Sequence, residues 1–159
     1  MDFTFGTLLG FMAISLAVIP PGLASSMAVG IVGRAGAGVI TEDPDKFGPI
    51  LLLQAIPGTQ GVYGFLTGLM IMVRMGVLGG GVKMLTTNQG ITFLLAAFPV
   101  AIVCWLSAVF QGQVAATGVG VVAKRPEEMG KAVILAAMVE TYAVLSLLAS
   151  LLLVFSIQV

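Results

Sequence analysis

Glu140 is the acidic residue that lies deepest inside an apolar stretch of this chain, the run AVILAAMVETYAVLSLLASLLLVF. A carboxylate at membrane depth costs several kcal/mol unless it is paired, protonated or holding an ion. The placement of Glu140 therefore predicts an ion or proton site inside a membrane.

Polar side chains on two other apolar segments are predicted to reach the depth of Glu140. At about 1.5 Å per helical residue, Glu140 lies about 18 Å from the nearest charged loop, Gln60 about 21 Å and Gln111 about 20 Å. Thr59 adjoins Gln60, and Tyr63 lies one turn further on, on the same face as Thr59. The sequence thus predicts that Glu140, Gln60 and Gln111 meet near one level, with Thr59 and Tyr63 close by.

This predicted cluster suits a small hard cation, which prefers several oxygen ligands and at least one negative charge. The carboxylate would supply the charge, the amide and hydroxyl oxygens would replace water, and the phenol would donate a hydrogen bond to the carboxylate. A proton needs only the carboxylate and would leave the buried amides as a desolvation cost. The pattern favours a metal ion over a proton, and over polar residues that only join helices.

The pair Pro57-Gly58 precedes the cluster and predicts a weakened helix, because proline removes one backbone donor and its ring clashes with the preceding turn. Carbonyls freed at such a break can become ion ligands. The simple rule frees the carbonyl of Leu53, and distortion at a Pro-Gly pair would also expose that of Ile56.

The composition places the elements that carry these residues in a membrane. Hydrophobic residues make up 58% of the chain and charged residues 9%, whereas soluble domains have about a quarter charged residues. Helices of about 20 mostly apolar residues cross a ~30 Å hydrocarbon core. Four segments qualify: Phe5 to Ile40, Phe47 to Val73, Gly90 to Ala123 and Met129 to Ile157. The predicted fold class is all-α integral membrane, with four transmembrane helices.

Several classes of function are not expected for this composition. The net charge is zero and no basic stripe is present, so the sequence argues against nucleic-acid binding. It contains no GxxxxGK[ST] nucleotide loop, and we expect no catalytic site. The absence of histidine and the single Cys104 argue against a transition-metal site.

The basic residues predict the orientation in the membrane. Five of the seven lysines and arginines lie at or near the loops TEDPDK and KRPEE, and Arg74 and Lys83 lie on the other side. By the positive-inside rule, both loops face the cytoplasm and both termini face out. The expected location is the cell membrane, with several passes and contact with lipid.

An internal duplication is visible when the chain is aligned with itself at a shift of 82 residues, which places Pro44 on Pro126. The segments GAGVITEDPDKFG and GVGVVAKRPEEMG then coincide. The chain is predicted to be two tandem helical hairpins, residues 1–80 and 81–159. Because Glu140 coincides with Gly58, the first repeat is predicted to have lost its carboxylate.

Small residues at four-residue spacing mark the first and third predicted helices: Gly22, Ser26 and Gly30, then Ala108, Gly112, Ala116 and Gly120. Such stripes let membrane helices approach closely. Since the two helices are equivalent in the duplication, both are expected to line one crowded surface, either the inner wall of a ring or a contact within the chain.

Three stretches resemble a known family: QAIPGTQGVYGF, AVFQGQVAATG and AAMVETYAVL. They resemble the four-helix rotor proteolipid of V-type ATPases, and nearly the whole chain is similar to the bacterial sodium-translocating type. The resemblance implies that Tyr63 is the hydrogen-bond partner of Glu140. It also implies Na⁺ ligands at Thr59, Gln60, Gln111, Glu140 and the Ile56 carbonyl, which is thereby favoured over that of Leu53.

The same resemblance implies a homo-oligomeric ring that carries Na⁺, or alternatively H⁺, and has no catalytic site of its own. The first and third helices would lie inside the ring and the others outside. The loops at residues 41–46 and 124–128 would dock the central stalk. The ring would turn against a stator membrane subunit, coupled to ATP hydrolysis or synthesis.

Two rival functions remain open from the sequence. Four-helix multidrug exporters also use one membrane glutamate, but theirs belongs to the first helix and they show no tandem repeat. In a structural, channel-like oligomer, the polar residues would only join helices.

Overall fold

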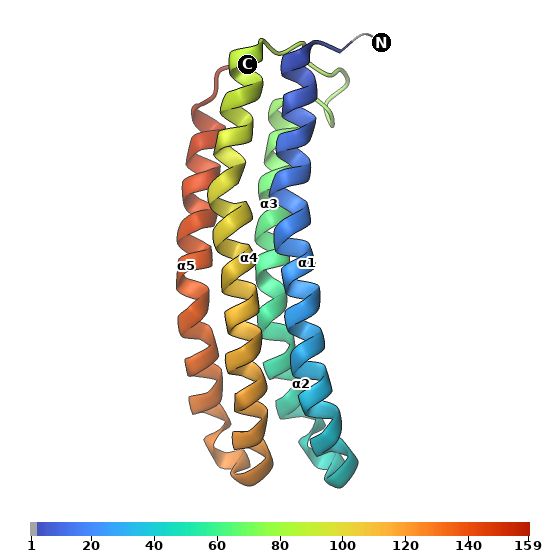
Figure 1. Cartoon of the computed structure of the whole chain (residues 1–159), viewed down its shortest axis with the longest axis vertical. Helices are drawn as coiled ribbons and strands as arrows, with labels where there is room; N and C mark the ends of the chain where they lie inside the picture. Colours follow the sequence, from blue (N-terminus) through green and yellow to red (C-terminus); the bar gives the residue numbers. More distant parts are fainter. Residues whose placement is uncertain (1–2) are drawn as a thin grey trace.

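The computed structural model describes residues 3–159, which form four long helical rods side by side (Figure 1). The first rod is α1 (Phe5–Glu42) and the third is α4 (Thr87–Lys124). The second contains a 3₁₀ turn (Pro44–Lys46), α2 (Phe47–Ala55), a second 3₁₀ turn (Ile56–Gly58) and α3 (Thr59–Arg74). The fourth contains a 3₁₀ turn (Pro126–Glu128) and α5 (Met129–Ser156).

All four rods are long and apolar enough to cross a membrane. Large apolar side chains cover their outer surfaces, including Leu152, which is 71% exposed, and Phe5, which is 65% exposed. An apolar surface of this extent is suited to lipid rather than water. The chain is a multi-pass membrane protein, as the sequence predicts. The two hairpin loops lie at one end of the bundle and both chain termini at the other (Figure 1).

The duplication is confirmed by structural landmarks that recur at the 82-residue shift. The Thr4 hydroxyl caps α1 by accepting a hydrogen bond from Thr7 N at 3.2 Å, and Thr86 caps α4 by accepting one from Gln89 N at 3.3 Å. Such caps satisfy backbone donors that a helix leaves unpaired at its start. The chain is therefore two tandem hairpins. The predicted division between residues 80 and 81 lies in the connection at residues 75–86 and stays a prediction.

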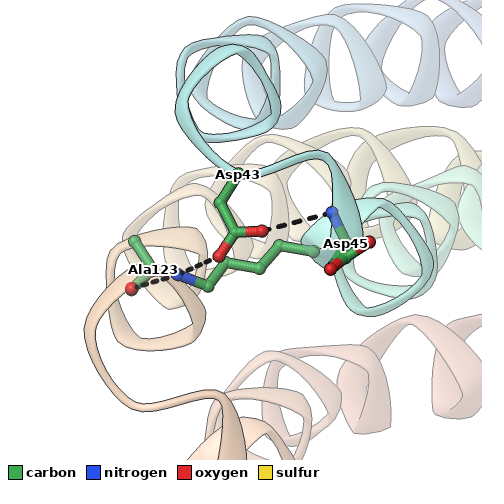
Figure 2. Close-up of polar contacts among 4 residues, drawn as sticks. Asp43, Asp45 and Ala123 are labelled. Carbon is green, nitrogen blue, oxygen red and sulfur yellow. Dashed lines mark hydrogen bonds and ion pairs between the residues drawn. The ribbon is translucent and has the colours of Figure 1, made fainter.

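The loop between α1 and α2 is tied to the second hairpin by Lys46. Figure 2 shows Asp43, Asp45 and Ala123 at this contact. Its ammonium group pairs with Asp43 at 3.0 Å and donates a hydrogen bond to the Ala123 carbonyl at 2.8 Å. The Asp43 carboxylate also accepts a hydrogen bond from the Asp45 backbone N–H at 3.2 Å. A cation suits this position because the end of α4 carries partial negative charge. The hydrogen bond from Lys46 lowers the pKa of the Asp43 carboxyl.

Small residues allow α1 and α4 to lie close together. Ala24, Ala28 and Ala108 form one buried cluster. A Cβ added at Gly112 would lie only 2.7 Å from the Ala28 Cβ, so the close approach requires glycine there. The row of small residues on α4 therefore makes the predicted close contact at Ala108 and Gly112.

The small residues of α1 behave differently from this expectation. A Cβ added at Gly22 or Gly30 would meet no atom within 4 Å, and Ser26 is exposed. The α1 stripe thus does not form the close contact with α4, for which α1 uses the face that carries Ala24 and Ala28 instead. The sequence could not distinguish these faces because α1 is apolar on all sides.

Candidate ion-binding site

Glu140 lies half-buried on α5, and Tyr63 approaches it from α3. The Tyr63 hydroxyl donates a hydrogen bond to Glu140 Oε1. This contact joins the second rod to the fourth and orients the carboxylate. The structure therefore brings Tyr63 and Glu140 together.

The two amide side chains are fully buried between three rods. Gln60 Nε2, on α3, donates a hydrogen bond to Gln111 Oε1, on α4, at 2.6 Å. Gln111 Nε2 donates in turn to the Ala136 carbonyl, on α5, at 3.0 Å. An amide oxygen has two lone pairs. Gln111 Oε1 therefore keeps acceptor capacity for an ion after accepting the hydrogen bond from Gln60.

The break between α2 and α3 positions the remaining predicted ligands. Pro57 lies in a 3₁₀ turn, and the Ile56 carbonyl accepts hydrogen bonds from the Thr59 backbone N–H and from Thr59 Oγ1, the latter at 3.1 Å. Thr59 Oγ1 also lies 3.4 Å from Gln60 Oε1. Ile56, Thr59 and Gln60 thus form one connected group. Within residues 3–159, no side-chain hydrogen bond joins this group to the Leu53 carbonyl.

The predicted residues therefore fall into two sets of contacts, and Ser107 lies between them. One set is the carboxylate with its phenol, and the other is the amide group. The Ser107 hydroxyl donates to the Val139 carbonyl at 3.0 Å, directly before Glu140 in the chain. It also accepts a hydrogen bond from Gln60 Nε2 at 3.3 Å. Ser107 thereby connects the amide set to the backbone that carries the acid.

Sequence reasoning missed Ser107 as a member of the site, although a signal was present. Ser107 precedes Gln111 by four residues, so the two side chains lie on one face of α4. The carbonyls of Ala136 and Val139 were missed as well. They carried no signal, since every residue has a carbonyl and only the packing of α4 on α5 selects these two.

The two sets together contain one carboxylate, two amide oxygens, one hydroxyl and one backbone carbonyl. All of these are oxygen ligands, which hard cations such as Na⁺, Mg²⁺ and Ca²⁺ prefer over nitrogen or sulfur. A single negative charge matches a monovalent ion better than a divalent one, because an uncompensated charge is costly at this depth. The same carboxylate could hold one proton.

Comparison with known families gives two matches to the ATP synthase C-subunit family, at residues 12–71 and 94–153. The two ranges are offset by the same 82 residues as the duplication. The matches decide against the multidrug-exporter alternative and explain why both hairpins share one pattern.

Two relatives are similar over nearly the whole chain. The V-type sodium ATPase subunit K of Enterococcus hirae is 41% identical over 151 residues, which cover 95% of this chain and 93% of that protein. The A-type ATP synthase subunit K of Methanocaldococcus jannaschii is 37% identical over 150 residues, which cover 94% of this chain and 63% of that protein. The chain therefore belongs to the ATP synthase C-subunit family and carries that family's unit twice.

Proposed function

We propose that this chain is a rotor-ring subunit of a V/A-type ATPase that carries Na⁺ across the cell membrane at Glu140. The family matches and the two subunit K relatives support the rotor role. The observation that carries the ion site is the half-buried Glu140 beside two fully buried amides, Gln60 and Gln111. Na⁺ is further supported by the Enterococcus hirae relative, which is a sodium ATPase subunit.

In the proposed site, the ionised carboxylate of Glu140 balances the charge of the ion. Neutral oxygens replace the ion's water: those of the Gln60 and Gln111 amides, the Thr59 hydroxyl and the Ile56 carbonyl. Tyr63 is not a ligand but holds the carboxylate by its hydrogen bond. Such a site stabilises a desolvated cation because each lost water is replaced by a fixed oxygen.

Transport requires that the ion leave when the environment of Glu140 changes. The carboxylate is only half-buried, between α3 and α5, so a cationic group on the stator could approach it as the ring turns. An arginine there would compete with Na⁺ for the same charge. The loops at residues 41–46 and 124–128 would face the cytoplasm and dock the central stalk, which couples rotation to ATP hydrolysis or synthesis.

The duplication determines how many ions each chain carries. Gly58 occupies the position in the first hairpin, residues 1–80, that Glu140 occupies in the second, residues 81–159. One carboxylate per four helices means one ion per chain. A ring of such chains moves fewer ions per turn than a ring with one acid per hairpin, which favours pumping against a steep gradient.

Proton transport by the same rotor is the second candidate, and one observation favours it. Gln60 and Gln111 hydrogen-bond each other, and the side-chain contact to Glu140 comes from Tyr63. A proton on Glu140 would need no change in the amide pair. Sodium, by contrast, requires the amide oxygens to face the carboxylate.

Carbodiimide labelling of Glu140 in purified rings distinguishes the two ions, because the reagent attacks a protonated carboxyl group. Labelling would be measured at fixed pH with added sodium and, as the matched control, with added potassium. Protection by sodium alone supports the sodium site. Labelling that follows pH and ignores both cations would identify Glu140 as a proton carrier and leave the amides with a structural role.

A further inference from the structure

The helix that starts beside the ion site does not carry its own cap. A helix leaves its first backbone N–H groups unpaired, and α1 and α4 pair one of these groups with the side chains of Thr4 and Thr86. In α3 the capping position is Gly58, which has no side chain that could accept a hydrogen bond. An unpaired N–H is costly inside a membrane, where water cannot replace the partner. The start of α3 therefore needs an acceptor from another part of the chain.

Ser25 on α1 provides this acceptor. The Gly61 backbone N–H, in the first turn of α3, donates a hydrogen bond to Ser25 Oγ at 2.8 Å. Ser25 is buried, with 6% of its surface exposed. A Cβ added at Gly61 would lie 3.3 Å from both Ser25 Cβ and Ser25 Oγ, so glycine at this position allows the close approach. The hydroxyl thus caps α3 as a threonine caps α1, but it comes from a neighbouring helix.

The capped turn carries neutral ligands of the proposed site. Gly61 directly follows Gln60, and Thr59 lies one residue earlier. The Thr59 hydroxyl donates to the Ile56 carbonyl at 3.1 Å across the break. A hydrogen bond that fixes the Gly61 N–H therefore also fixes the points at which Thr59 and Gln60 leave the backbone. Because Pro57 weakens the helix at the break, this turn depends on its cap more than an unbroken helix would.

The equivalent serine of the second hairpin forms its hydrogen bond in the opposite sense. At the 82-residue shift, Ser25 coincides with Ser107 and Gly61 with Ala143. Because α5 runs unbroken here, its N–H groups are paired within the helix, and the Ser107 hydroxyl donates to the Val139 carbonyl instead. A hydroxyl can do either, since it has one donor and two acceptor sites. Ser25 thus suits the broken helix, and Ser107 suits the unbroken helix that carries the acid.

We propose that Ser25 is a positioning residue of the ion site: by capping α3, it holds Thr59 and Gln60 where they can bind Na⁺. The proposal rests on the sodium site of the proposed function and adds a residue outside its ligand set. Ser25 acts through the backbone of α3 and leaves the acid on α5 unchanged. Loss of its hydroxyl should therefore weaken sodium binding without changing how Glu140 takes up a proton.

The test compares Ser25→Ala with Ser26→Ala in purified rings of the full chain, by carbodiimide labelling of Glu140. Ser26 is the matched control, because it is the next residue, is exposed, and donates within its own helix to the Leu23 carbonyl at 2.8 Å. Ser25→Ala removes the acceptor of the Gly61 N–H, so half-protection should need about threefold to tenfold more sodium. Ser26→Ala should need the same sodium concentration as the unaltered chain.

Labelling without sodium, measured over a range of pH, separates positioning from general loosening. The pH of half-labelling should be the same in Ser25→Ala as in the unaltered chain, because Glu140 keeps its hydrogen bond from Tyr63. A change in this pH as large as the change in sodium requirement would overturn the proposal. An equal sodium requirement in Ser25→Ala and Ser26→Ala would overturn it too. If sodium gives the unaltered chain no protection, the sodium site of the proposed function is wrong, and this inference falls with it.

A second variant reaches the same contact without removing the hydroxyl. Gly61→Ala places a methyl group 3.3 Å from Ser25 Oγ, so the two helices must move apart slightly, and the sodium requirement should rise by a similar factor. The double variant Ser25→Ala with Gly61→Ala should show less than the product of the two single effects, because both act on one hydrogen bond. Effects that multiply fully in the double variant would contradict the proposed contact.

Discussion

The two hairpins are built alike but differ where one carries the acid. In the second hairpin, α5 runs unbroken through Glu140. In the first, the equivalent segment is the 3₁₀ turn Ile56–Gly58, which interrupts the helix. The first hairpin thus has a glycine and a helix break where the second has its carboxylate. The proposed ion site draws on both hairpins, since Ile56, Thr59 and Gln60 come from the broken rod.

The largest effect is expected from Glu140→Gln, which removes the only charge of the site while keeping its shape. Ion uptake and carbodiimide labelling should fall to background, and the oligomer should remain intact. Glu128→Gln is the matched control for carbodiimide labelling, because this loop glutamate pairs with Lys131 at 2.5 Å far from the site. Ion uptake that survives in Glu140→Gln would contradict the proposed role of the acid.

A carboxylate introduced at Gly58 tests how far the two hairpins differ in ion binding. Gly58→Glu should double the carbodiimide label per chain, since the Val29 methyl lies 3.7 Å from an added Cβ and leaves room for a side chain. The new carboxyl should gain no protection from sodium, because the counterparts of Gln60 and Gln111 at the 82-residue shift are Tyr142 and Val29, which carry no amide. Sodium protection at residue 58 would show that an ion can be held without the amide pair.

Removing one amide should weaken sodium binding without abolishing labelling. Gln111→Leu deletes an oxygen ligand and leaves Gln60 Nε2 without its 2.6 Å acceptor. The lost contact with a charged group costs about 1.5–3 kcal/mol, so half-protection should require about tenfold to a hundredfold more sodium. Gln113→Leu, at an exposed position two residues along α4, should change little. Equal effects of the two variants would assign the amides no part in ion binding.

The phenol should contribute less than the amides to ion affinity. Tyr63→Phe removes one hydrogen bond to Glu140 Oε1 and no ligand. We expect half-protection to need about threefold to tenfold more sodium, in line with a loss of about 1 kcal/mol. The other tyrosine provides the control, since Tyr142 is exposed in the single chain and its hydroxyl is not required by the site. A loss of sodium affinity as large as that in Gln111→Leu would indicate that Tyr63 is a ligand.

The smallest effect concerns the loop between α1 and α2, which Lys46 ties to the second hairpin. Lys46 lowers the pKa of Asp43 below its ordinary value of 3.8. A lowered pKa in the folded state contributes stability above pH 3.8 that is lost as the pH falls through the folded-state pKa. Asp43→Asn should therefore lower the melting temperature slightly at pH 7 and not at pH 2. Asp45→Asn is the control, and a pH-independent difference would contradict the ion-pair explanation.

Much of the site could be predicted because its strongest signals are local. Glu140 stands out in an apolar run, and the helical rise alone places Gln60 and Gln111 at its depth. The hydrogen bond between the two amides was not predictable, since depth does not tell which side of a helix a residue faces. The role of Ser107 was not predictable for the same reason.

The sequence by itself determined the four spans, the duplication and the depth of the acid, because apolar length, repeated residues and rise per residue are local quantities. Only the tertiary structure decided which faces meet. A membrane helix that is apolar all round has no periodic signal to separate a lipid-facing side from a packed one. The structure therefore had to show that Ala28 contacts Gly112 while the stripe with Gly30 stays open.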